Sequence, residues 1–212
     1  MSTTIPIRPN ALPKNYPAVP AVYPTALFRL QVEAVQRYLY ETELKEILTE
    51  AAIPLDVLNV ASRRVMLTVA HSAVFMQALQ EIIDDDKAVD YGHEAFIRCA
   101  SMIPRSANIP FIQRTLSSGD RQNNRIRESL AGFNHETGMN VSLKWRDSGE
   151  FDLLDDAAQH CYGYIASTPI CHIMTGYLEE SIFYLLGAKV ALAETNCMAL
   201  GAATCCWHGT FG

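Results

Sequence analysis

The sequence has 212 residues, of which 49% are hydrophobic and 19% are charged, and its formal net charge is −6. This composition excludes a disordered or collagen-like chain, and the length suits one domain with a substantial core. The negative charge argues against direct binding to nucleic acid, which requires a basic surface.

Six prolines fall in residues 1–24, so we expect this segment to be an extended arm and residues 25–212 to form a single domain. The same prolines exclude a secretory signal, which needs an apolar stretch. We therefore expect a cytoplasmic protein whose six cysteines are reduced. No segment has the run of about 20 apolar residues that a transmembrane helix requires.

Apolar residues recur at helical intervals in the first half of the chain. The spacing predicts helices over residues 25–51, 62–83 and 90–102, followed by shorter helical segments between 111 and 133. The acidic run at residues 84–86 closes the second helix and is expected to be a solvated loop.

The pattern changes to strict alternation at residues 141–145, and a turn then leads into residues 150–154, which predicts a β-hairpin. Thr168 and Pro169 suit the start of a helix that ends before Gly187. Strands at 188–194 and 204–210 flank a turn and form a second hairpin. The predicted fold class is α+β, with helices packed on antiparallel hairpins.

Four residues of the C-terminal third have the chemistry of a metal site: Cys171, Glu194, Cys197 and Cys205. Cys171 is expected at the third position of its helix, where the helix dipole favours a thiolate. Glu194 is expected on an inward strand face, where a carboxylate needs a partner. Three thiolates and one carboxylate fill the four positions of a tetrahedral Zn²⁺, so such a site would be structural. The alternative is that the cysteines are ordinary core residues.

The same residues, in the same order and spacing, resemble the signature of a known protein family. A cysteine before a helix that ends in glycine, then Glu-x-x-Cys-x-x-x-Gly at 194–201, then Cys205, resembles the 4-vinyl reductase domain family. That family includes bacteriochlorophyll 4-vinyl reductase-like proteins and is related to the sensor domains of phenol- and xylene-responsive activators. The resemblance covers about residues 100–212 and implies zinc on the four residues, with Cys205 preferred to Cys206. Cys99, Cys161 and Cys206 remain as core or surface thiols.

Other residues are candidates for contact with a ligand or partner. His160 and His172 flank the metal region and could bind a porphyrin-type metal or line a pocket, and Trp145 could line an apolar pocket. Arg121 and Arg125 belong to an arginine-rich stretch suited to an acidic partner or to the carboxylates of a tetrapyrrole. The alternatives are structural histidines, core packing of the indole and a solvated helix face.

The resemblance implies a non-catalytic accessory protein that binds a hydrophobic ligand such as a tetrapyrrole. Its process would be (bacterio)chlorophyll biosynthesis or the assembly of chlorophyll–protein complexes at photosynthetic membranes. One alternative is a stand-alone sensor domain for aromatic small molecules, although Leu192 stands where a phenol-binding site would want a hydroxyl. Another is a 4-vinyl tetrapyrrole reductase that uses an external reductant. Exposed hairpin edges suit a homodimer or a heterodimer with a paralogue.

Overall fold

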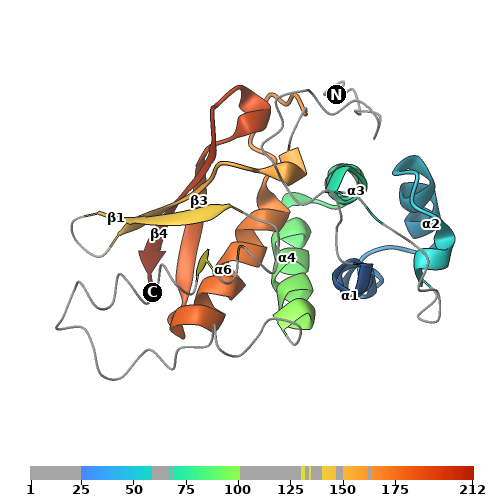
Figure 1. Ribbon diagram of the computed structural model, residues 1–212, viewed down its shortest axis with the longest axis horizontal. Helices are drawn as coiled ribbons and strands as arrows, with labels where there is room; N and C mark the ends of the chain where they lie inside the picture. The colour runs from blue at the N-terminus through green and yellow to red at the C-terminus, as the bar shows by residue number, and fades with distance from the viewer. Residues whose placement is uncertain are drawn as a thin grey trace.

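The computed structural model describes residues 25–58, 67, 69–100, 130, 131, 134, 140–146, 150–161 and 164–212. The proline-rich arm lies outside the described residues, as do nearly all of the helical segments expected between residues 111 and 133. The described part is an α+β fold, which confirms the predicted class. A sheet lies at one end of the molecule, α6 (His172–Leu186) and α4 (Asp85–Cys99) cross its middle, and the other end is formed by α1 (Thr25–Val35), α3 (Val69–Ile82) and α2 (Glu41–Glu50) (Figure 1).

The first predicted helix is in fact two helices, α1 (Thr25–Val35) and α2 (Glu41–Glu50). The chain turns between them, and the backbone N–H of Tyr40 donates a 2.7 Å hydrogen bond to the Glu43 carboxylate. This hydrogen bond is one of the two that make up a capping box, a motif that marks the start of a helix. The apolar spacing continued across the turn because both helices bury a face in the same core.

The expectation that residues 84–86 form a loop is also wrong. After α3 (Val69–Ile82), Asp84 is the N-cap of α4 (Asp85–Cys99), and its Oδ1 accepts a 2.9 Å hydrogen bond from the backbone N–H of Lys87. Asp85 and Asp86 occupy the first turn of α4, where the helix dipole stabilises negative charge. The acidic run is therefore a helix start.

Helix α6 (His172–Leu186) packs closely along α4. Gly92 and Gly176 face each other at the crossing, and a Cβ atom on Gly176 would clash with the backbone carbonyl of Val89. The close approach therefore requires glycine at this point. Helix α6 begins at His172, three residues after the predicted start, and ends at Gly187, whose φ of 63° confirms the predicted glycine C-cap.

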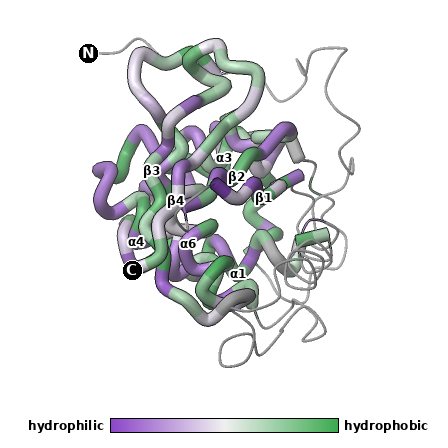
Figure 2. Tube along the Cα trace, turned by 90° about the vertical axis from the view of Figure 1, so that its left-hand side faces the viewer, coloured by the Kyte–Doolittle hydropathy of each residue, from purple (hydrophilic) through white to green (hydrophobic). Residues whose placement is uncertain are grey.

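Four strands of the described residues form one antiparallel sheet in the order β1-β2-β4-β3. The strands are β1 (Val141–Trp145), β2 (Phe151–Asp155), β3 (Val190–Asn196) and β4 (Cys205–Phe211). Both predicted hairpins are confirmed, and they join where β2 pairs with β4. Figure 2 shows the four strands side by side in this order. Two short 3₁₀ turns matter for the site, η5 (Gln159–Cys161) after β2 and η6 (Met198–Leu200) between β3 and β4.

None of the helices in the described ranges combines the length and the apolar character that crossing a bilayer demands.

Candidate metal centre and adjoining pocket

The structure brings the four predicted metal ligands together. Cys171 precedes α6, Glu194 lies near the end of β3, Cys197 follows that strand and Cys205 begins β4. One donor atom from each residue lies within 4.8 Å of the other three. The Sγ atom of Cys171 is 3.5 Å from that of Cys197 and 3.7 Å from that of Cys205. All three thiols are buried.

A β-bulge allows Glu194 and Cys197 to face the same site. These residues are three positions apart, and in a regular strand an odd spacing places side chains on opposite faces. The pairing of β3 with β4 shifts register between Glu194 and Asn196, so one extra residue enters β3. A bulge of this kind redirects the following side chains. The same alternation separates Cys205 from Cys206, which belongs to no donor group among the described residues.

The carboxylate of Glu194 has one paired and one unpaired oxygen. Its Oε2 atom accepts a 3.1 Å hydrogen bond from the backbone N–H of Cys171. Its Oε1 atom is buried without a hydrogen-bond partner in the described part of the chain. Burial raises the pKa of this carboxyl to about 8, because a charged carboxylate loses its hydration there. A cation at this position would satisfy the orphaned oxygen.

Two of the three thiols favour the thiolate form, because hydrogen bonds from neighbouring thiols lower the pKa of Cys197 and of Cys205, whereas burial raises the pKa of Cys171. The pKa of Cys205 is lowered to about 6, chiefly by hydrogen bonds from the thiols of Cys161 and Cys171. The backbone N–H of Met198 also points at the Cys205 sulfur at 3.3 Å. Thiolate is the form that binds metal, and soft sulfur ligands with one carboxylate suit zinc. The donor set thus fits the predicted ion, which would join α6 to both strands of the C-terminal hairpin.

Cys171 itself is not at the third helical position. It is the N-cap of α6, with φ −88° and ψ 29°, and its side chain makes no capping hydrogen bond. The first helical hydrogen bond runs from the backbone N–H of Thr175 to the Cys171 carbonyl at 2.8 Å, and residues 168–170, which precede it, line a pocket. The thiol is therefore directed at the cluster, while its backbone N–H holds Glu194.

Two further donors join the cluster: His160, which was predicted to flank the metal region, and Cys161, which was expected to be only a core or surface thiol. The Sγ atom of Cys161 is 3.3 Å from that of Cys205, and His160 Nε2 is 3.3 Å from the Sγ atom of Cys171. Both residues lie in η5. The pairing of Asp155 with Cys205 brings the end of β2, and hence η5, beside the start of β4. No spacing motif could reveal this, because the proximity comes from sheet register.

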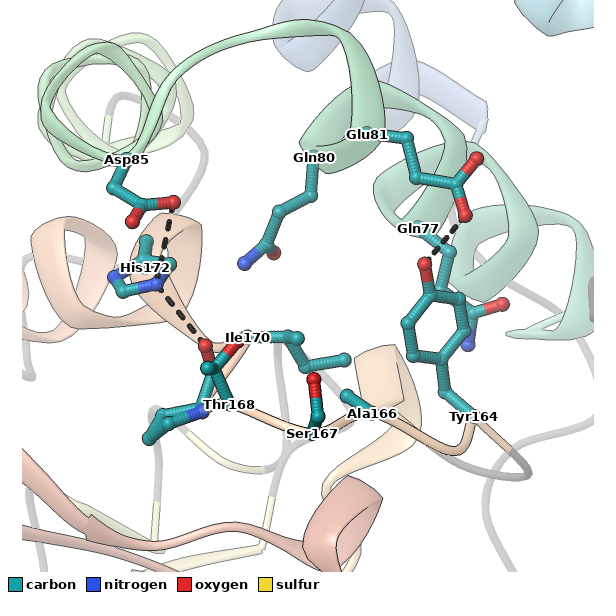
Figure 3. Close-up of a pocket in the computed structure, with 11 residues that line it drawn as sticks. Gln77, Gln80, Glu81, Asp85, Tyr164, Ala166, Ser167, Thr168, Ile170 and His172 are labelled. Atoms are coloured by element: carbon teal, nitrogen blue, oxygen red, sulfur yellow. Dashed lines mark hydrogen bonds and ion pairs between the residues drawn. The ribbon is translucent and has the colours of Figure 1, made fainter. Parts of the chain in front are cut away.

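A pocket of about 400 Å³ adjoins the metal centre. Its walls are α3, the segment 164–170, and the facing starts of α4 and α6, and polar and apolar atoms share its lining about equally. Figure 3 shows the amide of Gln80 pointing into the open space between these walls. Its Nε2 atom is buried and has no hydrogen-bond partner among the residues that the structure describes.

His172 and Trp145, which were predicted to contact a ligand or partner, belong to neither donor group of the metal centre. His172 lines the pocket, with Nε2 3.1 Å from the Pro169 carbonyl and 3.4 Å from Asp85 (Figure 3). Trp145 stacks on Phe211 with 5.7 Å between ring centroids and is not part of the pocket lining. Arg121 and Arg125 lie outside the described residues.

Solved structures with a similar fold are H-NOX proteins. An H-NOX protein from S. oneidensis in the Fe(II)NO ligation state aligns over 89% of this chain and 98% of its own, with 14% identity and a TM-score of 0.53. An Fe(II) unliganded H-NOX protein from K. algicida covers 89% and 96%, with 10% identity and a TM-score of 0.52. The phenol-responsive sensory domain of the activator PoxR aligns with 15% identity and a TM-score of 0.44, over 80% of this chain and 90% of its own.

No protein-family model matches the chain, and no curated protein matches it either. At these identities the H-NOX likeness establishes a shared fold. The resemblance to the 4-vinyl reductase domain family stays a prediction from the residues that carry it.

Proposed function

We propose that the protein is a small-molecule-binding domain of the sensor type, with a structural zinc ion that fixes one wall of its ligand pocket. One observation carries this proposal. Cys171, a ligand of the proposed metal centre, lies in the chain between Ile170 and His172, which both line the pocket. A metal that holds Cys171 would keep this wall in position before a ligand arrives. The entropic cost of ordering the wall on ligand binding would then be lower.

The pocket chemistry defines the ligand class. The unpaired Nε2 atom of Gln80 needs an acceptor. The carboxylates of Glu81 and Asp85 contact Tyr164 and His172, and their remaining lone pairs can accept a further hydrogen bond from a ligand. A hydroxyl or amino group on the ligand can act both as a hydrogen-bond acceptor and as a hydrogen-bond donor. The Tyr164 ring and the Ile170 side chain offer apolar surface beside these groups. We therefore propose a compact, single-ring molecule that carries a hydroxyl or amino substituent.

The size of the pocket agrees with such a ligand. Its volume of about 400 Å³ lies at the small end of the range of roughly 300–1,000 Å³ that is usual for ligand pockets. The H-NOX structures also support a binding role, because they are recorded with NO or CO as ligands of Fe(II). We extend the role of binding a small ligand to this chain, but we do not propose that it binds iron.

The tetrapyrrole alternatives depend on the resemblance to the 4-vinyl reductase domain family. An accessory protein of chlorophyll synthesis or assembly would bind a pigment, and a 4-vinyl reductase would need an external electron donor. Neither has support from the pocket, whose volume suits a much smaller molecule. The binding experiment described next includes a tetrapyrrole pigment, so that it tests these alternatives as well.

The test is a thermal-shift and calorimetric titration of the zinc-loaded chain with phenol, aniline and a protochlorophyllide-type pigment. We expect binding of phenol or aniline and weaker binding of toluene, which lacks the polar substituent. Replacement of Gln80 by Leu should weaken binding at least tenfold, whereas the same change at the exposed Gln36 should not. Binding of the pigment alone would favour the accessory role, and no binding by any compound would contradict the ligand proposal.

A further inference from the structure

We infer that the cluster holds a second metal ion, bound by His160 and Cys161 and bridged to the first by the sulfurs of Cys171 and Cys205. The inference rests on the proposed zinc centre and extends it. The potential donors form two groups of four, and within each group all donor atoms lie within 4.8 Å of one another. One group is the predicted set. The other is His160, Cys161, Cys171 and Cys205.

The two groups have the composition of two tetrahedra that share an edge. Cys171 and Cys205 belong to both groups, and each group adds two donors of its own: Glu194 and Cys197 in one, His160 and Cys161 in the other. Thiolate sulfur has enough lone pairs to bridge two metal ions. Six residues therefore complete four-coordination at two ions, and neither ion needs a water molecule.

The distances agree with metal-bound sulfur. A tetrahedral zinc with Zn–S bonds of about 2.3 Å and Zn–N bonds of about 2.0 Å spaces its ligand atoms roughly 3.5–3.8 Å apart. The two shared sulfurs are 3.7 Å apart. In the second group, Cys161 and Cys205 are separated by 3.3 Å, and His160 Nε2 lies 3.3 Å from the Cys171 sulfur. Small movements would bring both contacts to the expected spacing.

The turn that supplies the second group is held in place. Ala158, just before η5, is fully buried and has a φ of 30°, in the region that residues other than glycine rarely adopt. Its carbonyl accepts a 3.0 Å hydrogen bond from the backbone N–H of Cys161. From the other side, the amide of Gln77 donates a 3.2 Å hydrogen bond to the carbonyl of His160. These contacts hold η5 where the side chains of His160 and Cys161 reach the shared sulfurs.

Charge also favours two ions. A single divalent ion bound by three thiolates and one carboxylate leaves two negative charges in a buried site. A second divalent ion, with Cys161 as a fourth thiolate and a neutral imidazole, leaves only one. Buried net charge is costly, so the larger cluster is easier to accommodate. The sulfur-rich donor set selects zinc or another thiophilic divalent ion such as Cd²⁺.

Metal counting of the full-length wild-type protein tests the inference. The protein is purified with zinc present, excess metal is removed by gel filtration, and zinc is measured by mass spectrometry against protein concentration. We expect two zinc ions per chain. One zinc ion per chain would contradict the inferred second centre but agree with the proposed zinc centre. A chain without zinc would contradict both.

Substitutions assign the ions to their ligands. Cys161→Ala and His160→Ala should each lower the zinc content from two ions to one, while Cys99→Ala, outside both groups, should keep two. With ¹¹³Cd in place of zinc, we expect two resonances for the wild type, coupled through the shared sulfurs, and one for Cys161→Ala. If Cys161→Ala retained the wild-type metal content, Cys161 would be only a hydrogen-bond donor to Cys205. The wild-type count stays decisive even where a variant does not fold.

Discussion

The hydroxyl group of Thr175 connects the centre of the core to the metal site. It accepts a 2.9 Å hydrogen bond from the buried indole N–H of Trp207 and donates a 3.0 Å hydrogen bond to the carbonyl of Cys171. Trp207 lies on β4, two residues after the predicted metal ligand Cys205. One side chain therefore joins the strand and the helix that both supply ligands, and both of its hydrogen bonds are away from water.

Replacement of Thr175 by Val should destabilise the fold. Valine has a similar shape but cannot accept the indole N–H, and a buried donor without a partner costs about 1–3 kcal/mol. We expect the free energy of unfolding in urea to fall by this amount. Thr49→Val is the matched control, because the Thr49 hydroxyl is exposed and its hydrogen bond to Lys45 competes with water. Equal effects at both positions would contradict the role given to Thr175.

Helices α4 and α6 form the central layer, and two features hold them together. One is the glycine contact between Gly92 and Gly176. The other is His93 on α4, whose ring lies 3.0 Å from Glu179 and 3.2 Å from Glu180 on α6. Glu179 also accepts a 2.8 Å hydrogen bond from the backbone N–H of Leu192, which extends the contact to β3.

The substitution Gly176→Ala tests the helix contact. Alanine favours an isolated helix by about 1 kcal/mol, but here its Cβ atom would push α6 away from α4. Overpacking of this kind costs about 1–3 kcal/mol, and we expect net destabilisation in urea unfolding. Gly92→Ala should behave similarly. Because either change opens the same contact, the double variant should lose less stability than the sum of the two single losses.

His93 should make stability depend on pH. Its hydrogen bond to Glu179, helped by Glu180 and opposed by burial, raises its pKa above 6.5 in the folded protein. The ion pairs therefore stabilise fully below about pH 6.5, the unfolded value, and the benefit is lost as pH rises through the folded value. His93→Gln should lower stability at pH 5.5 by up to about 1 kcal/mol, after allowance for solvent screening. At pH 9 it should have little effect, and a cost independent of pH would contradict the linkage.

For the whole molecule, the proposed zinc centre joins the sheet to the helical layer. Its ligands come from the start of α6 and from both strands of the C-terminal hairpin. A metal that binds the folded state but not the unfolded chain stabilises the fold by its binding free energy. The pocket shares a wall with this centre, so metal loading should affect both stability and ligand binding.

Removal of zinc should therefore destabilise the protein. A loss of about 3 kcal/mol would lower Tm by roughly 6–12 °C for a chain of this length. We expect a chelator to cause such a decrease in the wild type, as followed by circular dichroism, and Cys197→Ser, which removes a ligand of the first centre only, to reduce the response to chelator. Cys99→Ala, which changes a buried thiol outside both donor groups, should keep it. An unchanged wild-type Tm would argue against a structural metal.

The elements that local patterns predicted correctly are those whose signals are confined to a few residues. Alternation located β1, the turn after it located β2, and glycine located the end of α6. The break between α1 and α2 was missed because apolar periodicity continues through it. Asp84 was assigned to a loop although an acidic residue before a helix is a recognisable N-cap signal. Residues 168 and 169 have the chemistry of a helix start, yet α6 begins at His172, and the residues before it line the pocket.

Residue types and short spacings were enough to predict the α+β class and the four donors of the proposed metal centre, because these patterns are local. Which other side chains meet those donors depends on the packing of distant segments. Cys161 and Cys205 are 44 residues apart, and the wall residues Tyr164 and Glu81 are 83 apart. Sheet register places η5 beside β4, and a single bulge in β3 turns Glu194 and Cys197 to one side. Such contacts depend on how whole elements pack, and no local pattern of residues records that packing.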